Sequence, residues 1–204
     1  MIFHAPLDEV WNSRLKTRIL RQLCQSRYGF SGRQLAGFVG HSHTQTLATL
    51  DELEAQGLVL RRQAGRAYLF TINEDHVVVT DILIPAFHLE SALLNSLADV
   101  FYDGLGQRLT SVILFGSVAR GEENTESDVD LLLVVKNGVN KEQLEMKAID
   151  VAFDASRRFG NHISPIVVTK SEYDGKLKRK QGFWKDIPTD GRTLLPKKER
   201  EAIG

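Results

Sequence analysis

Two stretches of this chain decide its fold: Leu114-Phe115-Gly116-Ser117-Val118-Ala119-Arg120-Gly121 and Ser127-Asp128-Val129-Asp130-Leu131-Leu132-Leu133-Val134. The first stretch ends a short apolar run rich in β-branched residues, which predicts a buried strand that stops at Gly116-Ser117. A glycine at this point lets the backbone approach a ligand, and a helix that begins there offers free N–H groups to an anion. The first stretch therefore predicts a phosphate-binding turn.

The second stretch predicts a strand that begins with two acidic side chains. Asp128 and Asp130 are two residues apart, so on a strand their carboxylates share one face, roughly 6.6 Å apart along the chain. Carboxylates this close repel each other unless a cation lies between them. Apolar residues continue on both faces after the two acids, which predicts a strand that is covered on both sides. A phosphate-binding turn beside a divalent-cation site is the equipment of phosphoryl or nucleotidyl transfer.

Together the two stretches resemble the signature of the DNA polymerase β-type nucleotidyltransferase superfamily, in particular its short, minimal branch. The resemblance implies that Gly116 and Ser117 hold the triphosphate of ATP or another nucleotide. It implies that Asp128 and Asp130 are catalytic and bind Mg²⁺. Arg120 is expected either near the phosphates or in a salt bridge with the acidic loop that follows it.

In that superfamily a third carboxylate, on a later strand, completes the site. The corresponding segment here, residues 162–168, contains no acid, and Ser164 occupies the expected position. Two interpretations therefore remain open. The chain is either a nucleotidyltransferase that moves AMP from ATP to an unknown hydroxyl, with His162 as a substitute base, or a catalytically impaired, nucleotide-sensing transcription regulator.

Residues 8–73 predict a second, separate module. Helices are expected over 8–27, with Trp11 in the apolar stripe, over 31–39, with Ser31 as the N-cap, and over 42–56. At the start of the third, a capping box is expected, in which the Ser42 hydroxyl accepts the N–H of Gln45 and the Gln45 side chain reaches back. A β-hairpin with strands 58–62 and 67–72 follows. This order resembles a winged helix-turn-helix of the MarR and ArsR kind, in which the third helix lies in the DNA major groove. The resemblance implies base contacts from Ser42, His43, Thr44, Gln45 and Thr49, and phosphate contacts from Arg61, Arg62 and Arg66. A dimerisation or protein-docking role is the alternative.

Charge and composition agree with two modules in an ordinary globular protein. Residues 8–72 hold nine Lys/Arg and five Asp/Glu, whereas residues 73–107 hold six Asp/Glu and no Lys/Arg, so the basic first module is the one expected to meet an anionic partner. One cysteine among 204 residues, no membrane-length apolar run and no signal-peptide pattern predict a cytoplasmic chain without disulfides.

The sequence thus predicts an α+β chain with three parts: a winged helix-turn-helix domain (1–73), a helical linker (74–106) and a nucleotidyltransferase-like domain (107–204). Within the last domain, helices are expected over 141–159 and 176–187, and a charged tail is expected from Pro196. An edge strand is expected over 163–169, because Pro165 has no backbone N–H to donate to a neighbouring strand. The expected partners are a nucleotide triphosphate, double-stranded DNA and a protein acceptor, without a membrane. A homodimer would fit the two half-sites that such domains commonly read.

Overall fold

The computed structural model of the protein describes residues 3–203. The chain divides into two compact units, Met1–Ser91 and Ala92–Gly204, and each has its own buried apolar core. The division lies inside the segment 74–106 that the sequence predicts as a linker. The predicted domains 1–73 and 107–204 also include residues 1, 2 and 204, which lie outside the described residues. Helices and sheets occur in both units, so the predicted α+β class is confirmed.

The first unit begins with four helices: α1 (Pro6–Val10), α2 (Arg14–Cys24), α3 (Gly32–Val39) and α4 (His43–Ala55). The prediction of one continuous helix over 8–27 is wrong. The chain leaves the helix after Val10, and Ser13 has extended backbone angles and accepts the N–H of Leu15 with its hydroxyl, which starts α2. Trp11, expected to face the core, is 42% exposed because it lies in this break.

Side-chain caps fix the starts of the next two helices. Ser31 and Gln34 form a complete capping box at α3, since each side chain accepts a backbone N–H of the other residue. Ser42 caps α4 by accepting the N–H of Gln45, as predicted. The return bond differs from the prediction, because Gln45 Oε1 accepts from the Ser42 hydroxyl and not from its backbone N–H.

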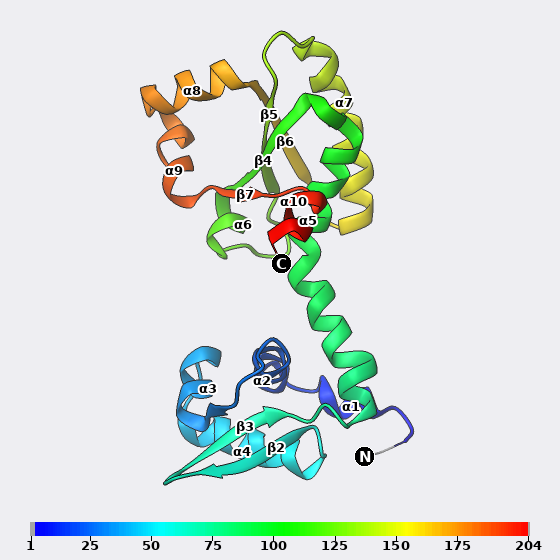
Figure 1. Ribbon diagram of the computed structural model, residues 1–204, viewed down its shortest axis with the longest axis vertical. Coiled ribbons are helices and arrows are strands. Elements are labelled where there is room, and N and C mark those ends of the chain that lie inside the picture. Colours follow the sequence, from blue (N-terminus) through cyan, green and yellow to red (C-terminus); the bar gives the residue numbers. More distant parts are fainter. Residues whose placement is uncertain (1–2, 204) are drawn as a thin grey trace. The chain divides into compact units, whose positions relative to one another are not determined.

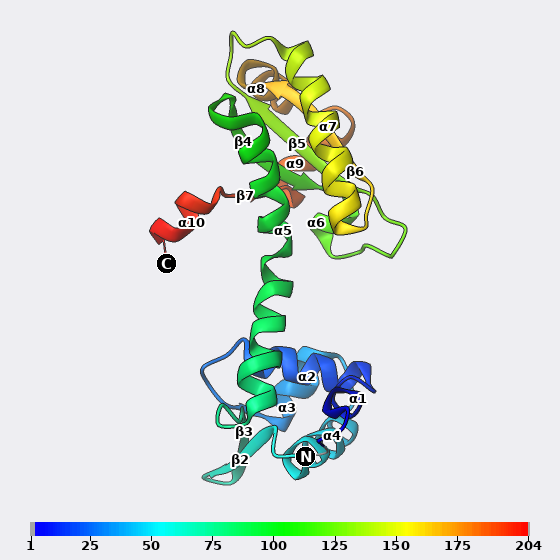
Figure 2. The ribbon, with the colours of Figure 1, turned by 90° about the vertical axis from the view of Figure 1, so that its right-hand side faces the viewer.

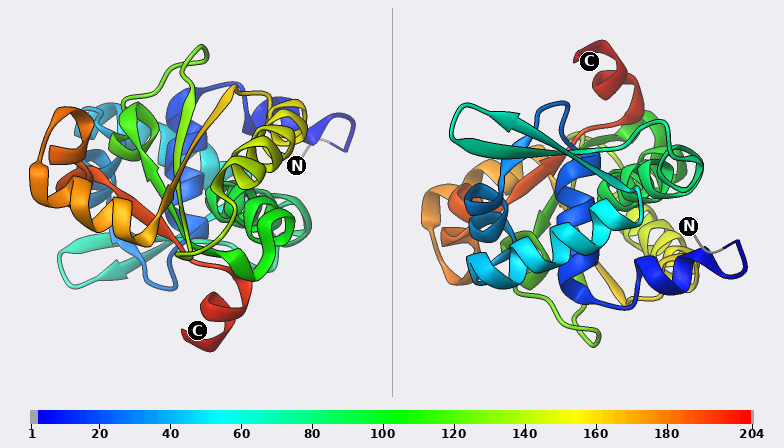
Figure 3. Two further views of the ribbon diagram at one scale, coloured as in Figure 1. Left: turned by 90° about the horizontal axis from the view of Figure 1, so that it is seen from above. Right: turned by 90° about the horizontal axis from the view of Figure 1, so that it is seen from below.

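A β-hairpin follows the helices. Strands β2 (Val59–Ala64) and β3 (Ala67–Ile72) pair in antiparallel fashion, and the short strand β1 (Phe30–Ser31) pairs with the other edge of β3. The hairpin extends beyond the helices of this unit (Figure 3). Helices α2 to α4 followed by this hairpin form the predicted winged helix-turn-helix fold.

A π-helical turn η1 (Val79–Leu83) leads into helix α5 (Ile84–Leu105), which begins in the first unit and ends in the second. Pro85 lies two residues after the end of η1, inside this continuous helical segment, and it has no N–H to donate to the preceding turn. Phe87 belongs to the core of the first unit and Phe101 to the core of the second. Among the helices of the described residues, none combines the length and the apolar character that crossing a membrane requires.

The second unit is built on a four-stranded sheet in the order β6-β5-β4-β7. Its strands are β4 (Leu109–Phe115), β5 (Val129–Val135), β6 (Ile163–Thr169) and β7 (Arg192–Leu194). Strands β5 and β6 are parallel and the other pairs are antiparallel. Strand β6 lies at one edge, as Pro165 predicts.

Helices cover both faces of this sheet (Figure 1). The C-terminal part of α5 and helix α7 (Lys141–Phe159) pack on one face, where the odd-numbered residues of β5 are buried. Helix α8 (Lys170–Arg179) and the 3₁₀ turn η3 (Gly182–Lys185) pack on the other, against Leu132 and Val134 of β5. Strand β5 is therefore buried on both sides, as the sequence predicts.

The C-terminal segment departs from the prediction in two places. The prediction of a single helix over 176–187 is wrong: this segment contains the end of α8, the turn η3 and the start of α9 (Ile187–Asp190). Helix α8 begins earlier, at Lys170, because Thr169 and Glu172 form a capping box there. The expected tail contains helix α10 (Lys197–Ile203) (Figure 2). Its Arg200 guanidinium lies 2.6 Å from the Asp99 carboxylate of α5.

Candidate active site and DNA-binding surface

A close contact between Gly116 and Asp130 forms the centre of the candidate active site. Gly116 is the first residue of the short helix α6 (Gly116–Arg120), and Asp130 pairs with Phe115 across β4 and β5. A Cβ atom at position 116 would lie 2.3 Å from Asp130 Oδ2, and the φ angle of Gly116 is +76°. Only glycine accommodates both conditions without movement of the carboxylate. The turn and the acidic strand, recognised separately in the sequence, therefore meet at this point.

The start of α6 leaves donors available beside this contact. Phe115 precedes the helix with an extended backbone, and its side chain makes no capping hydrogen bond. The first N–H groups of a helix have no partner within the helix, so those that begin at Gly116-Ser117 are free to meet an anion.

Asp128 lies in the loop just before β5, not within the strand as predicted. Its carboxylate is 3.4 Å from Nδ1 of His162, and the same nitrogen is 3.3 Å from the hydroxyl of Ser164. Ser164 is in register with Asp130 across the parallel pair β5–β6. The structure thus brings Asp128, Asp130, His162 and Ser164 to one end of these two strands.

Electrostatic strain is concentrated on Asp130. Burial, and secondarily the nearby Asp128 carboxylate, raise the pKa of Asp130 above its ordinary value. Bound Mg²⁺ would oppose both effects because it stabilises the ionised carboxylate. Within residues 3–203, no three His, Cys, Asp or Glu side chains are grouped to hold a metal. Mg²⁺ commonly takes one or two carboxylates and completes its shell with phosphate oxygens and water, so Asp128 and Asp130 fit a metal that arrives with a nucleotide.

Arg120 adopts the second of its two expected arrangements. Its guanidinium lies 2.7 Å from the carboxylate of Glu122 in the acidic loop and 4.0 Å from that of Asp190. The hydrogen bond to Glu122 raises the pKa of Arg120 further above its ordinary value. The side chain is exposed, so a phosphate would compete for it with an exposed carboxylate.

Sequence reasoning missed an aromatic cluster on the Asp130 face of the sheet. The rings of Phe115 and Phe183 stack with centroids 5.0 Å apart, and Trp184 adjoins Phe183 at 4.7 Å. Phe115 directly precedes Gly116, so the cluster packs the turn η3 against the end of β4. The adjacent aromatic residues Phe183 and Trp184 were the only sign of this cluster in the sequence, because Phe115, on which Phe183 stacks, is 68 residues away from Phe183.

A groove of about 680 Å³ between α7 and β6 was also missed. Ile149, Phe153 and Pro165 are among its lining residues, and it extends to His162 and Ser164. Met146, Ile149 and Phe153 are 62–66% exposed and lie on one side of α7 at helical spacing. Their spacing in the sequence indicated a second apolar stripe on this helix, beside the one that faces the core.

In the first unit, the predicted base-contacting residues lie at the start of α4. Ser42 is the N-cap, and His43, Thr44 and Gln45 are exposed in the first turn. Thr49 follows one turn later, half-buried, and its hydroxyl donates to the backbone oxygen of Gln45.

The three predicted phosphate contacts differ from one another. The Arg61 guanidinium forms ion pairs with Asp51 and Glu54 of α4, at 2.7 Å for Glu54, and packs over the rings of Tyr68 and Phe70. Arg62 and Arg66 are exposed in the hairpin, and neither forms an ion pair within residues 3–203.

A third acid of α4, Glu52, is also neutralised. Its carboxylate lies 3.0 Å from the ammonium of Lys16, a residue of α2 that is 5% exposed. Together with the Arg61 pairs, this contact reduces the negative field of α4 that a DNA phosphate would otherwise meet.

Residues 100–188, which contain this site, match the model of the nucleotidyltransferase domain family. Two proteins of Methanocaldococcus jannaschii, both named "Putative protein adenylyltransferase", are similar to the chain. One, MJ1305, is 37% identical over 86 residues, which are 39% of this chain and 58% of that protein. The other, MJ0141, is 42% identical over 67 residues, which are 33% of this chain and 67% of that protein. The chain belongs to the nucleotidyltransferase domain family.

The matched residues 100–188 lie within the second unit. The chain spans 58% and 67% of the lengths of these two relatives. Among solved structures, the chain is also similar to transcription regulators. The transcription regulator MepR of Staphylococcus aureus is 15% identical, with a TM-score of 0.36, over 44% of this chain and 68% of that protein.

We expect Gly116→Ala to destabilise the nucleotidyltransferase domain more than Gly138→Ala does. Both glycines have φ near +77°, but a Cβ at position 138 meets nothing within 4 Å, whereas one at position 116 meets the Asp130 carboxylate. The difference in unfolding free energy should be roughly 1 to 2 kcal/mol, from overpacking alone. Urea unfolding of the two variants measures it, and equal losses would contradict the Gly116–Asp130 contact.

We expect Asp130→Asn to raise the melting temperature at pH 7 in the absence of divalent cations. Because the folded-state pKa of Asp130 is raised, its contribution to stability is present below the unfolded pKa, about 3.9, and is lost as the pH rises through the folded pKa. The amide never ionises, so the variant should melt on the order of 1–3 °C higher at pH 7. This gain should vanish below about pH 3.9. Calorimetry across pH 3 to 8 tests it, and a wild-type chain that melts higher at pH 7 would refute the assignment.

Proposed function

We propose that the nucleotidyltransferase domain transfers AMP from ATP to a hydroxyl group of a protein. The observation that supports this most directly is the contact of Asp130 with Gly116, which combines a carboxylate and uncapped helix N–H groups in one place. The names of the two archaeal relatives support the choice of AMP and of a protein acceptor.

Each residue then has a defined role. The backbone at Gly116 and Ser117 binds the triphosphate, while Arg120 exchanges Glu122 for a phosphate. Asp128 and Asp130 hold Mg²⁺, which supplies charge neutralisation for the triphosphate when it is bound.

The acceptor hydroxyl attacks the α-phosphorus, forms the new O–P bond and displaces pyrophosphate. Its proton passes to His162, whose ring lies beside Asp128 and Ser164. Ser164 occupies the position at which the family has its third carboxylate. Ser164 positions the His162 ring through the contact between its hydroxyl and Nδ1.

A protein acceptor agrees with the surface next to this site. The groove between α7 and β6 extends to His162 and Ser164, and its wall carries the exposed side chains of Ile149 and Phe153. Exposed apolar side chains gathered in this way mark interaction surfaces, and protein–protein contacts are among them.

We further propose that the winged helix binds double-stranded DNA. The first turn of α4, from Ser42 to Gln45, would enter the major groove, and Arg62 and Arg66 would contact phosphates. The neutralisation of Asp51, Glu52 and Glu54 by Arg61 and Lys16 favours this proposal because it reduces repulsion at the DNA face.

A second candidate function is a transcription regulator that senses nucleotide and transfers it slowly or not at all. The serine at position 164, in register with Asp130 where the family has an acid, favours this alternative. Both functions require Mg²⁺-ATP binding, so only a transfer assay separates them.

The transfer assay uses α-labelled ATP, Mg²⁺ and a lysate of the source cells. We expect label on a protein acceptor, with a loss on the order of 100-fold or more for Asp128→Asn and Asp130→Asn. Asp150→Asn, in an exposed carboxylate of α7, is the matched control and should label normally. Label that survives in both site variants would refute the transferase. Calorimetric Mg²⁺-ATP binding without any transfer would favour the regulator.

DNA binding has its own test in the salt dependence of affinity for duplex DNA. Arg62→Gln and Arg66→Gln should each reduce the slope of log K against log salt by about 1. Arg61→Gln should change the slope less, because its charge is already paired with Asp51 and Glu54. No retardation of duplex DNA by the wild-type chain at low salt would exclude this role.

A further inference from the structure

We propose that the groove between α7 and β6 binds a segment of the acceptor protein that carries an apolar side chain and, close to it, an acidic one. This inference rests on the proposed transfer of AMP to a protein, and it specifies which polypeptide segments the same site accepts. The groove has a volume of about 680 Å³ and is lined by residues of the second unit alone. Helix α7 and strand β6 lie side by side in that unit (Figure 2).

The order of the strands places the groove on the acceptor side of the candidate active site. Gly116, at the triphosphate site of the proposed function, follows β4, whereas Asp130 belongs to β5 and Ser164 to β6. These strands are neighbours in the order β4, β5, β6, and the groove begins at His162 and Ser164. A hydroxyl that attacks in line with the leaving pyrophosphate approaches from the side opposite the triphosphate, which is the side of the groove.

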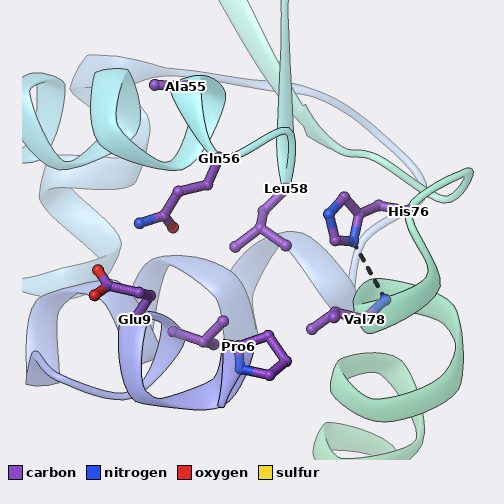
Figure 4. Close-up of a pocket in the computed structure, with 8 residues that line it drawn as sticks. Pro6, Glu9, Ala55, Gln56, Leu58, His76 and Val78 are labelled. Carbon is purple, nitrogen blue, oxygen red and sulfur yellow. Dashed lines mark hydrogen bonds between the residues drawn. The ribbon is translucent and has the colours of Figure 1, made fainter. Parts of the chain in front are cut away.

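Another pocket, of about 310 Å³, is lined by residues of the first unit alone. Figure 4 shows its His76 ring, whose Nδ1 accepts the backbone N–H of Val78. Its lining includes no residue of the candidate active site, whereas the groove beside α7 shares His162 and Ser164 with that site. The groove is therefore the cavity with a direct connection to the place of transfer.

The edge of the sheet beside the groove is unsuited to an added strand. Strand β6 lies at this edge, and the N–H groups of Ile163 and Thr169 are already used outside the sheet. The first donates to the hydroxyl of Ser156 and the second to the carboxylate of Glu172. Pro165, two residues after Ile163 and so on the same side, has no N–H. The edge lacks the row of donors that strand addition needs, so the acceptor segment binds through its side chains.

The wall of the groove fits an apolar side chain. Ile149 and Phe153 line it, are 62% and 65% exposed, and lie one turn apart on the same side of α7. Ala152 and Ile163 also line the groove and are buried. Apolar side chains that are exposed next to a buried apolar surface offer contact area to a further apolar group, which is the mark of an interaction site.

The charge of the groove selects an acidic neighbour for that apolar group. Among the described residues, Arg157 is the one Arg or Lys that lines the groove, and no Asp or Glu does. Its guanidinium is exposed and forms no ion pair within residues 3–203. Arg157 follows Phe153 by one helical turn, about 6 Å along α7. An extended segment covers this distance in about two residues, which sets the spacing between its apolar and acidic side chains.

The transfer assay with α-labelled ATP, Mg²⁺ and a lysate of the source cells tests the groove when the amount of lysate is varied. Phe153→Ala and Arg157→Glu should each raise the lysate concentration for half-maximal labelling about tenfold or more, because each removes a central contact. The maximal rate should change little, since neither residue touches the reacting atoms. Arg157→Lys, which keeps the charge, should retain most of the labelling.

Met146→Ala and Arg158→Glu are the matched controls and should label like the wild type. Met146 is about as exposed as Phe153 on the same helix, and Arg158 adjoins Arg157, but neither lines the groove. Mg²⁺-ATP binding, measured by calorimetry, should be the same in all variants, which separates acceptor binding from nucleotide binding and shows that the variants fold. Ile149→Ala, a smaller change at an exposed position, replaces Phe153→Ala if that variant loses ATP binding.

The outcomes distinguish this inference from the function on which it rests. If the wild-type chain labels a protein and the groove variants label like the controls, the groove is overturned as the acceptor site while the transfer function stands. Normal labelling by Arg157→Glu alone overturns the requirement for an acidic side chain. If the wild-type chain labels no protein, the transfer function fails, and the assignment of the groove fails with it.

Discussion

The contact between the Asp130 carboxylate and the backbone of Gly116 is the constraint on which the second unit depends. It requires the antiparallel register that sets Phe115 against Asp130, and a glycine with a positive φ angle at the next residue. Burial of this carboxylate, and secondarily the nearby Asp128 carboxylate, raise its pKa. The fold thus holds an acidic group in a place that is unfavourable for its charge, which is a common property of functional sites.

The rest of the sheet explains why this unfavourable group stays in place. Strand β5 is buried on both faces, so the many apolar contacts of Leu131, Leu132 and Leu133 outweigh the cost at Asp130. Asp128, by contrast, lies in the loop and is exposed, with its carboxylate 3.4 Å from Nδ1 of His162. One carboxylate is therefore fixed by a strand and the other is free to adjust, an arrangement suited to a metal that arrives together with its nucleotide.

Ion pairs play the corresponding role in the first unit. The acids of α4 would give this helix a negative surface, yet Lys16 and Arg61 neutralise them from α2 and β2. Lys16 is almost fully buried, and its aliphatic stem packs in the interior while the ammonium reaches Glu52. The residues at the start of α4 are left as its exposed polar end, away from these pairs.

The sequence by itself determined the features that depend on near neighbours. The apolar spacing determined the extent of α7, and the missing backbone N–H of Pro165 determined the edge position of β6. The hydroxyl of Ser31 determined the start of α3. All three are local properties. The two motifs also identified the nucleotidyltransferase family and the residues that meet at Gly116. Only the tertiary structure decided how distant residues combine. The pairing of Arg61 with α4, the stacking of Phe183 on Phe115 and the groove beside α7 each arise where separate segments of the chain pack together. Periodicity within one segment carries no information about such contacts, because their energy depends on the partner that the fold supplies.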